Sequence, residues 1–183
     1  MKKMYGIKNP DVENEKTILK KAKKYGLDTD NIVTVDSRHF LQALDKQGLP
    51  DCSIYDSKGK YIEYRQADTS CNAGLFGLIP ALNLNTVYNQ PDTLTLQEEW
   101  KNFLDLKGNA VAMPDSADFY VLSYWTVWTG KLNKDHVLVW EEMAQANKNA
   151  NVKFIKVNLD IQEYWKEEER EKTLEIMSKS KSK

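Results

Sequence analysis

The chain carries two cysteines, Cys52 and Cys71, and no Cys-x-x-Cys pair anywhere in its 183 residues. Three interpretations are open. Cys71 stands at the start of an expected helix, where the helix N-terminus favours the thiolate and would make this thiol a nucleophile. Alternatively, the two cysteines form a disulfide, which persists only outside the cytosol, or both are unreactive thiols of the kind that proteins commonly bury. A thiol-dependent enzyme using Cys71 or Cys52 is therefore compatible with the sequence but is not required by it.

The other residue types that carry chemistry form no recognisable site. His39 and His136 each lie within an expected helix, and neither has a histidine, cysteine or carboxylate arrangement at metal-ligand spacing beside it. No glycine-rich phosphate loop follows an expected strand. The consecutive carboxylates at 167–169 cannot all share one helix face and are typical of a solvated helix. The sequence therefore indicates no catalytic residue, no metal and no cofactor.

Composition excludes several classes of protein. Hydrophobic residues make up 41% of the chain and charged residues 29%, with a formal net charge of -1, so the chain can bury a core and is not a disordered polymer. Nucleic-acid binders show a clustered basic excess, whereas the four lysines at 20–24 fall on the polar face of an expected helix. We therefore expect no nucleic acid as a partner. No apolar run reaches the ~18–20 residues of a transmembrane segment.

The compartment stays open. The first residues, Met1-Lys2-Lys3, are similar to the charged opening of an export signal, but no apolar stretch follows them. The protein is either cytoplasmic, or it belongs to the cell envelope or periplasm and its export signal has been removed.

Strand and helix patterns alternate up to residue 82 and must position any site. The expected order is β-α-β-α-β-β-α, with strands at 3–7, 31–35, 52–55 and 60–64, and helices at 13–25, from Asp36 or Ser37, and at 71–82. A turn at 56–59 joins the two adjacent strands, and its glycine supplies the positive φ that the turn needs.

The second part of the chain follows a linker at 85–93, which is rich in Asn, Pro and Asp and has little periodicity. Thr95 and Glu98 form a capping box that begins a helix. Strands are expected at 118–125 and 152–159, helices at 133–147 and from 161 onward, and a disordered tail at 178–183. We therefore predict one domain at 1–84 and a second domain at 94–177.

Two segments resemble the thioredoxin-like superfamily. The segment 48–60 reads GLPDCSIYDSKGK and is similar to the family's Gly-Ile-Pro-Thr segment with its following strand and hairpin. In that family the proline, here Pro50, is cis and lies against the redox site. The segment 118–132 reads DFYVLSYWTVWTGKL and is similar to the central strand followed by Trp-x-x-Trp-Cys-Gly-x-Cys. The segment 152–160 is similar to the next strand of the family with its closing Asn/Asp turn.

The resemblance implies an α/β, thioredoxin-like fold: a mixed sheet flanked by helices at 1–84, and a second, incomplete thioredoxin-like βαβ half at 94–177. Thr129 and Leu132 stand at the two cysteine positions, so the dithiol is absent and disulfide exchange has no thiols to use. What remains is the family's surface for extended substrates. It implies contact residues at these positions: Pro50, Trp125, Trp128, Thr129, Gly130 and Leu132. The sequence also resembles uncharacterised thioredoxin-like lipoproteins of bacterial envelopes.

Three functional hypotheses follow. The leading one is a non-catalytic thioredoxin-fold protein that binds a protein or an extended peptide, by strand addition beside Pro50. The second is the thiol-dependent enzyme described above. The third is an assembly subunit, in which the incomplete second half completes its sheet on a partner or on a second copy of the chain.

Overall fold

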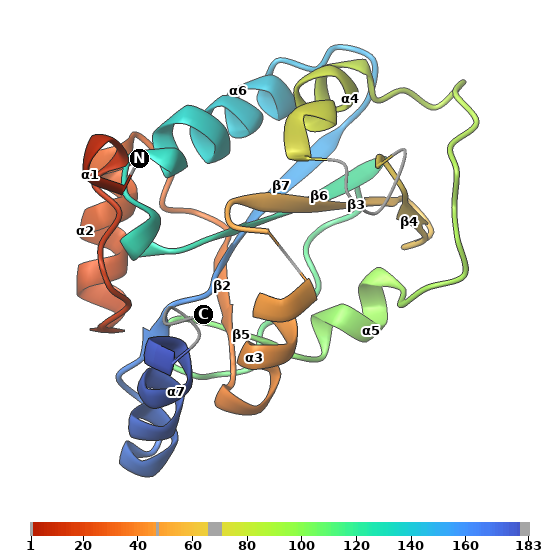
Figure 1. The fold of residues 1–183 in the computed structure, drawn as a ribbon. Coiled ribbons are helices and arrows are strands. Elements are labelled where there is room, and N and C mark those ends of the chain that lie inside the picture. The colour runs from red at the N-terminus through yellow and green to blue at the C-terminus, as the bar shows by residue number, and fades with distance from the viewer. Residues whose placement is uncertain (1, 47, 66–70, 180–183) are drawn as a thin grey trace.

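One six-stranded mixed sheet forms the centre of the protein, with strand order β4-β3-β6-β7-β2-β5 (Figure 1). The computed structural model describes residues 2–46, 48–65 and 71–179. The strands are β2 (Ile32–Val35), β3 (Asp51–Asp56), β4 (Tyr61–Ile62), β5 (Phe103–Leu104), β6 (Phe119–Trp125) and β7 (Val152–Asn158). β6, β7 and β2 are parallel, whereas β3 is antiparallel to β6 and β5 to β2. The predicted α/β class, with a mixed sheet flanked by helices, is confirmed.

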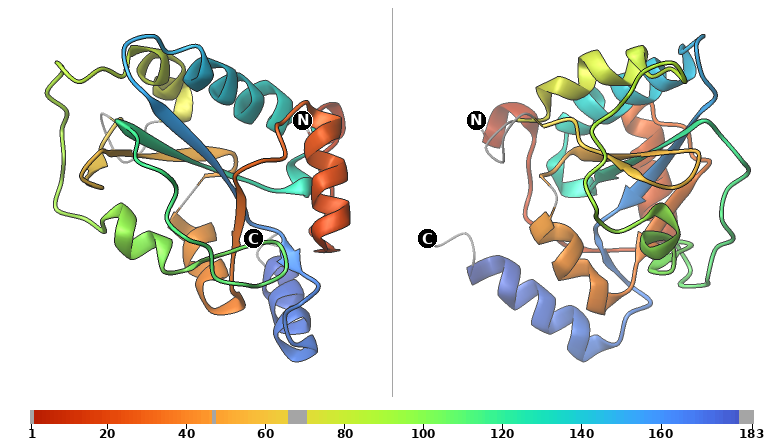
Figure 2. Two further views of the ribbon diagram at one scale, coloured as in Figure 1. Left: turned by 180° about the vertical axis from the view of Figure 1, so that it is seen from behind. Right: turned by 90° about the vertical axis from the view of Figure 1, so that its right-hand side faces the viewer.

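Helices cover both faces of this sheet (Figure 2). One apolar core contains buried side chains of α2 (Glu15–Tyr25), α4 (Leu75–Ala81) and α6 (Val139–Gln145). The opposite core contains side chains of α3 (Ser37–Lys46), α5 (Leu96–Trp100) and α7 (Glu167–Lys179). β6 lies between the two cores, and all seven of its residues are buried. This explains its nearly continuous apolar sequence, because a strand covered on both faces has no solvent-facing positions.

Local capping signals set several element boundaries. The expected capping box is confirmed: Glu98 N–H donates to Thr95, and the Glu98 carboxylate accepts from Thr95 N–H at 2.8 Å. Asn14 and Thr17 form a second box at the start of α2. The β3–β4 turn is also as expected, since Asp56 Oδ1 accepts two backbone hydrogen bonds and Gly59 has φ 78°.

The two ranges expected as separate domains contribute strands to the same sheet. β3 pairs with β6 over six positions, from Asp51–Tyr124 to Asp56–Phe119, and β2 pairs with β7. Strands from the range 1–84 therefore flank the β6–β7 pair within the sheet, β3 beside β6 and β2 beside β7. Residues 85–93 contain no helix or strand and run along the outside of the molecule (Figure 1).

The strand expected at 3–7 was wrong. Residues Lys2–Tyr5 form the short helix α1, and the first strand is β1 (Val12–Glu13). β1 pairs with β8 (Ile161–Gln162), where a helix was expected, and α7 begins only at Glu167. Pairing with β1 has overridden the local helical pattern at Ile161–Gln162. The helix predicted at 133–147 begins with a π-helical turn, Asn133–Leu138.

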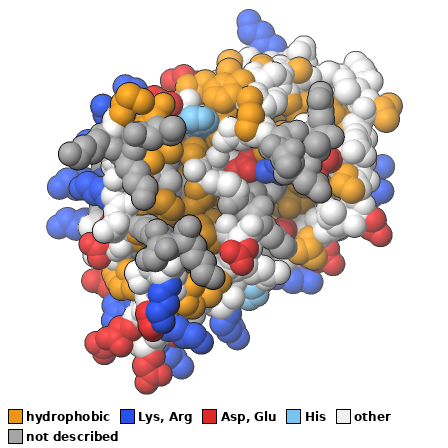
Figure 3. Space-filling view, in the orientation of Figure 1, with side chains coloured by type: hydrophobic (Ala, Val, Ile, Leu, Met, Phe, Trp, Pro, Cys, Tyr) orange, Lys and Arg blue, Asp and Glu red, His pale blue; other side chains and the backbone are white. Residues whose placement is uncertain are grey.

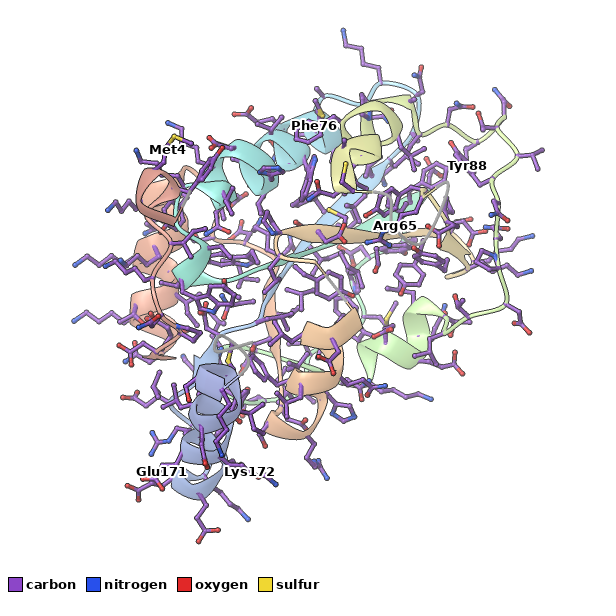
Figure 4. All side chains as sticks on the ribbon, viewed as in Figure 1. Met4, Arg65, Phe76, Tyr88, Glu171 and Lys172 are labelled. Atoms are coloured by element: carbon purple, nitrogen blue, oxygen red, sulfur yellow. The ribbon has the colours of Figure 1, made fainter. Side chains whose placement is uncertain are left out.

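α7 carries many charged side chains, among them Glu171 and Lys172 (Figure 4). Hydrophobic side chains instead gather over α4 and α6 on the face shown in Figure 3. The disordered tail was expected at 178–183; Ser178 and Lys179 belong to α7, and residues 180–183 lie outside the described residues.

Candidate functional site

The candidate site is the loop 126–132, which follows β6 at the carboxyl ends of the parallel strands β6 and β7. Ligands of α/β proteins commonly bind at this edge of the sheet. Trp128, Thr129, Gly130 and Leu132 all lie in the loop. Trp125 ends β6, and the Asp51–Tyr124 pairing places Pro50 beside the same strand end. The structure therefore brings the six predicted contact positions to one edge.

Thr129 holds the loop together from the inside. Its side chain is buried, and its hydroxyl lies 2.8 Å from the Thr126 carbonyl oxygen and 2.9 Å from Oδ1 of Asn133. The Asn133 amide donates to the same Thr126 carbonyl at 2.8 Å. A hydroxyl engaged in this way neither faces a partner nor acts as a nucleophile. The expectation that Thr129 forms part of a contact surface is therefore wrong. Its buried side chain instead stabilises the loop through hydrogen bonds within it.

Asp160 joins the loop to the end of β7. Its Oδ2 accepts hydrogen bonds from Val127 N–H and Asn158 Nδ2, each at 2.7 Å. Gln162 Nε2 donates to Asn158 Oδ1 at 3.1 Å and to the Asp160 carbonyl at 2.8 Å. Burial raises the pKa of Asp160 to about 7 despite these bonds, and nearby Glu13 adds to the effect. Oδ1 of Asp160 has no hydrogen-bond partner among the described residues.

The sequence pattern placed Asp160 in the turn that follows the strand at 152–159, and Asp160 was not among the predicted site residues. The available signal was the alternation of Asn158, Asp160 and Gln162 directly after an apolar strand. Polar side chains at alternate positions share one side of an extended segment, and here all three are buried.

Three of the other predicted contact residues, Pro50, Trp125 and Gly130, are also buried. Trp125 has no exposed surface and belongs to the core, which corrects its assignment to a contact surface. Pro50 is buried after a cis Leu49–Pro50 bond, and its carbonyl accepts from Asn72 Nδ2 at 2.7 Å. Only Trp128 and Leu132 are partly exposed.

The protein's own segment 5–8 covers this loop. Lys8 N–H donates to the Trp128 carbonyl at 2.9 Å, and Lys131 N–H donates to the Tyr5 carbonyl at 2.8 Å. Between these bonds, Gly130 has φ 64°, and a Cβ added there would lie 2.4 Å from the Tyr5 carbonyl oxygen. Only glycine fits this close approach. The region predicted to receive a partner is thus occupied by the chain itself.

Neither cysteine belongs to the loop 126–132, and both are free thiols, so the disulfide alternative is not what the structure contains. Cys52 is fully buried in β3, and burial raises its pKa well above the ordinary value. This argues against Cys52 as a nucleophile, because the thiolate is the reactive form. Cys71 is exposed and precedes a three-residue 3-10 helix, Asn72–Gly74.

A buried ion pair lies beneath α6. Lys156 on β7 contacts Glu141 on α6, and the two side chains are 1% and 5% exposed. The second carboxylate oxygen of Glu141 accepts from Asp28 N–H at 3.2 Å. Strand register places Lys156 beside Ser123, which in turn lies beside Cys52. The pair therefore fixes α6 to the middle of the sheet.

Comparison with known protein families, curated proteins and solved structures finds no match to this chain. Within residues 2–46, 48–65 and 71–179, no group of three His, Cys, Asp or Glu side chains is placed to hold a metal ion. None of the described helices combines the length and apolar character needed to cross a membrane.

Proposed function

We propose that the protein is a non-catalytic, thioredoxin-like binding protein that receives an extended peptide segment at the loop 126–132. The fold class supports the resemblance. β6, α6 and β7 form a parallel βαβ unit at the centre of the sheet, and Pro50 introduces the antiparallel β3–β4 hairpin beside it. In the family the hairpin follows the central βαβ unit along the chain. Here it precedes that unit, so the proposal includes an exchanged order of the two parts within one sheet.

The observation that carries the binding role is the backbone pairing between the loop and segment 5–8. The Trp128 carbonyl accepts one hydrogen bond and the Lys131 N–H donates the other. Backbone pairing of this kind gives affinity without demanding a particular sequence, while neighbouring side chains provide selectivity. The partly exposed Trp128 and Leu132 side chains supply the apolar surface for such selection.

The loop also lacks the means for redox chemistry. Thr129 and Leu132 occupy the positions of the family's two cysteines. The Thr129 side chain is buried, and its hydroxyl is hydrogen-bonded within the loop. A partner bound here would be held without forming a mixed disulfide. Binding of a partner peptide requires that segment 5–8 first leave the loop, because both would use the same N–H and carbonyl groups.

A variant lacking residues 2–8 tests the proposal. We expect it to bind a fluorescent synthetic peptide with the sequence of residues 2–9, and the full chain to bind the same peptide at least tenfold more weakly. A scrambled peptide and Gly130→Val in the truncated variant are the controls, since the valine side chain would fill the space of the Tyr5 carbonyl. A folded truncated variant that does not bind the peptide would overturn the proposal.

A second variant serves if the truncated chain does not fold. Lys8→Pro removes the segment's N–H that donates to the Trp128 carbonyl and leaves the loop's own N–H and carbonyl groups intact. In the intact chain it should increase amide exchange at residues 5–7 and allow peptide binding in trans. Unchanged exchange and no peptide binding would count against the proposed site.

A further inference from the structure

Two apolar side chains between α4 and α5 stand clear of the protein. Val87 is 98% exposed and Leu84 is 63% exposed. They belong to the segment 83–88, which follows α4 and runs along the outer edge of the molecule (Figure 1). A single exposed apolar side chain is ordinary on a protein surface, so the hydrogen bonds and charges around these two decide what they do.

Hydrogen bonds within the segment hold it in one shape. The Tyr88 hydroxyl accepts from Asn83 N–H at 2.9 Å and donates to the Asn83 carbonyl at 3.2 Å, which closes the segment on itself. The Asn83 side chain accepts from Asn85 N–H at 3.0 Å and donates to the Thr86 hydroxyl at 2.8 Å. Because the segment is already ordered, it loses little conformational entropy when it binds.

Contacts at both ends fix the segment to the body of the protein. Before it, Asn147 Nδ2 donates to the Leu82 carbonyl at 3.0 Å. After it, Glu63 N–H donates to the Asn89 carbonyl at 2.9 Å. Residues 84–87 are all exposed between these two anchors. The leucine and valine side chains therefore form a convex apolar tip on a fixed base.

The tip belongs to a stretch of chain without charge. Residues 71–91 contain no Asp, Glu, Lys, Arg or His, although 29% of the whole chain is charged. Charges beside the two ends of the segment have opposite signs. The exposed Lys148 follows the anchoring Asn147, and Asp56 Oδ2 accepts from Gln90 Nε2 at 2.7 Å. The tip therefore offers a partner apolar contact rather than net charge.

We propose that the segment 83–88 is a lipid-contacting loop, which inserts Leu84 and Val87 into the apolar boundary of a phospholipid surface. A fluid lipid surface closes around a convex tip, whereas a protein partner must supply a pocket of matching shape. The polar Asn85 and Thr86 side chains stay at the level of the headgroups. The loop shares no residue with the loop 126–132, and this inference does not depend on the peptide-binding role.

The charge pattern also sets the kind of lipid. Anionic lipids attract clusters of Lys and Arg, and the tip has none. Binding therefore comes from burial of two apolar side chains, which makes it weak, reversible and independent of headgroup charge.

Co-sedimentation of the full chain with sucrose-loaded phosphatidylcholine vesicles tests the proposal. We expect saturable binding at millimolar lipid, which changes less than twofold when phosphatidylglycerol is added to the vesicles or the salt concentration is raised. Binding to anionic vesicles alone, lost at high salt, would show an electrostatic contact and overturn the proposal. Absence of binding by the folded chain would overturn it as well.

Variants locate the contact. The double change Leu84→Asp, Val87→Asp should weaken vesicle binding at least tenfold, because a carboxylate resists transfer into an apolar medium. Met113→Asp changes another exposed apolar side chain, 41% exposed and outside the segment, and should bind as the unchanged chain does. Val87→Trp should bind several-fold more tightly, because indole favours the bilayer interface. Equal binding by the double variant and the unchanged chain would overturn the assignment.

Light scattering without vesicles distinguishes lipid from a second copy of the chain. We expect a monomer at the concentrations used for sedimentation. A dimer that Val87→Asp dissociated would identify a second copy as the occupant of the tip and overturn the proposal. A thermal unfolding curve for each variant confirms that the fold is intact, as the 98% exposure of Val87 predicts.

Discussion

The backbone N–H of Val127 donates a 2.7 Å hydrogen bond to Oδ2 of Asp160, which ties the loop after β6 to the end of the neighbouring strand β7. Asp160 is 1% exposed, and burial raises its pKa from the ordinary 3.8 to about 7. The charged groups that act on it are few: Glu13 raises its pKa, and Tyr25 is itself affected by the Asp160 charge. The loop's anchor therefore changes charge near neutral pH.

Protein stability should fall as pH rises through this range. An acid whose pKa is higher in the folded than in the unfolded state binds more protons when folded, so its stabilising effect is complete below about pH 4 and is lost by about pH 7. The slope approaches about 1.4 kcal/mol per pH unit for one such group. Asp160→Asn should remove that part of the slope. Urea unfolding of both proteins between pH 4 and 8 measures it, and parallel curves for the two would contradict the prediction.

Gly130→Ala should destabilise the loop by ~1–3 kcal/mol, since alanine is strained at φ 64° and its Cβ would collide with the Tyr5 carbonyl oxygen. Release of segment 5–8 should accompany the loss, seen as faster proteolysis near residue 8. Gly77→Ala is the matched control. A Cβ at Gly77, inside α4, meets nothing within 4 Å, so this variant should be as stable as the unchanged chain or slightly more stable.

Glu141→Gln should cost ~3–5 kcal/mol, because it leaves the Lys156 ammonium buried without its countercharge. The double variant Glu141→Leu, Lys156→Met should recover much of that loss, since it removes both buried charges. Chemical denaturation of the single and double variants gives the comparison. Equal stability of the single variant and the unchanged chain would show that the pair contributes little.

Cys71 should react with iodoacetamide at the rate of an exposed thiol, and Cys52 should react only after unfolding, because it is fully buried and its thiolate is disfavoured. Mass spectrometry of the alkylated chain distinguishes the two sites. In an insulin-reduction assay with dithiothreitol we expect no turnover above the blank. Turnover that Cys71→Ser or Cys52→Ser abolished would instead support the thiol-dependent enzyme.

Local signals in the sequence predicted much of the fold. The Thr95–Glu98 capping box, the turn at 56–59 and the buried strand β6 depend on residues close together in the chain, and each is present. The shared sheet was not predictable in this way. The pairing of β3 with β6 joins residues about seventy positions apart, and no local pattern records which strands become neighbours.

The exposure of the candidate site residues could not be read from the sequence. The resemblance selected the segment that the structure places at the end of β6, but the Trp125 and Thr129 side chains are buried there. The Thr129 hydroxyl is hydrogen-bonded to Asn133, four residues further on. The Tyr5 carbonyl, from near the start of the chain, lies against Gly130. Side-chain direction and long-range cover depend on the assembled structure, so the sequence alone could not supply them.

The strand order also constrains how the protein is made. β2 and β3 are not neighbours in the sheet: β2 lies between β7 and β5, and β3 lies between β6 and β4. A ribosome releases residues 32–56 long before residues 119–158, so the early strands wait with open edges until the last third of the chain emerges. Such edges invite pairing with other chains. A nascent or prematurely ended chain is consequently the form most exposed to aggregation and most dependent on chaperones.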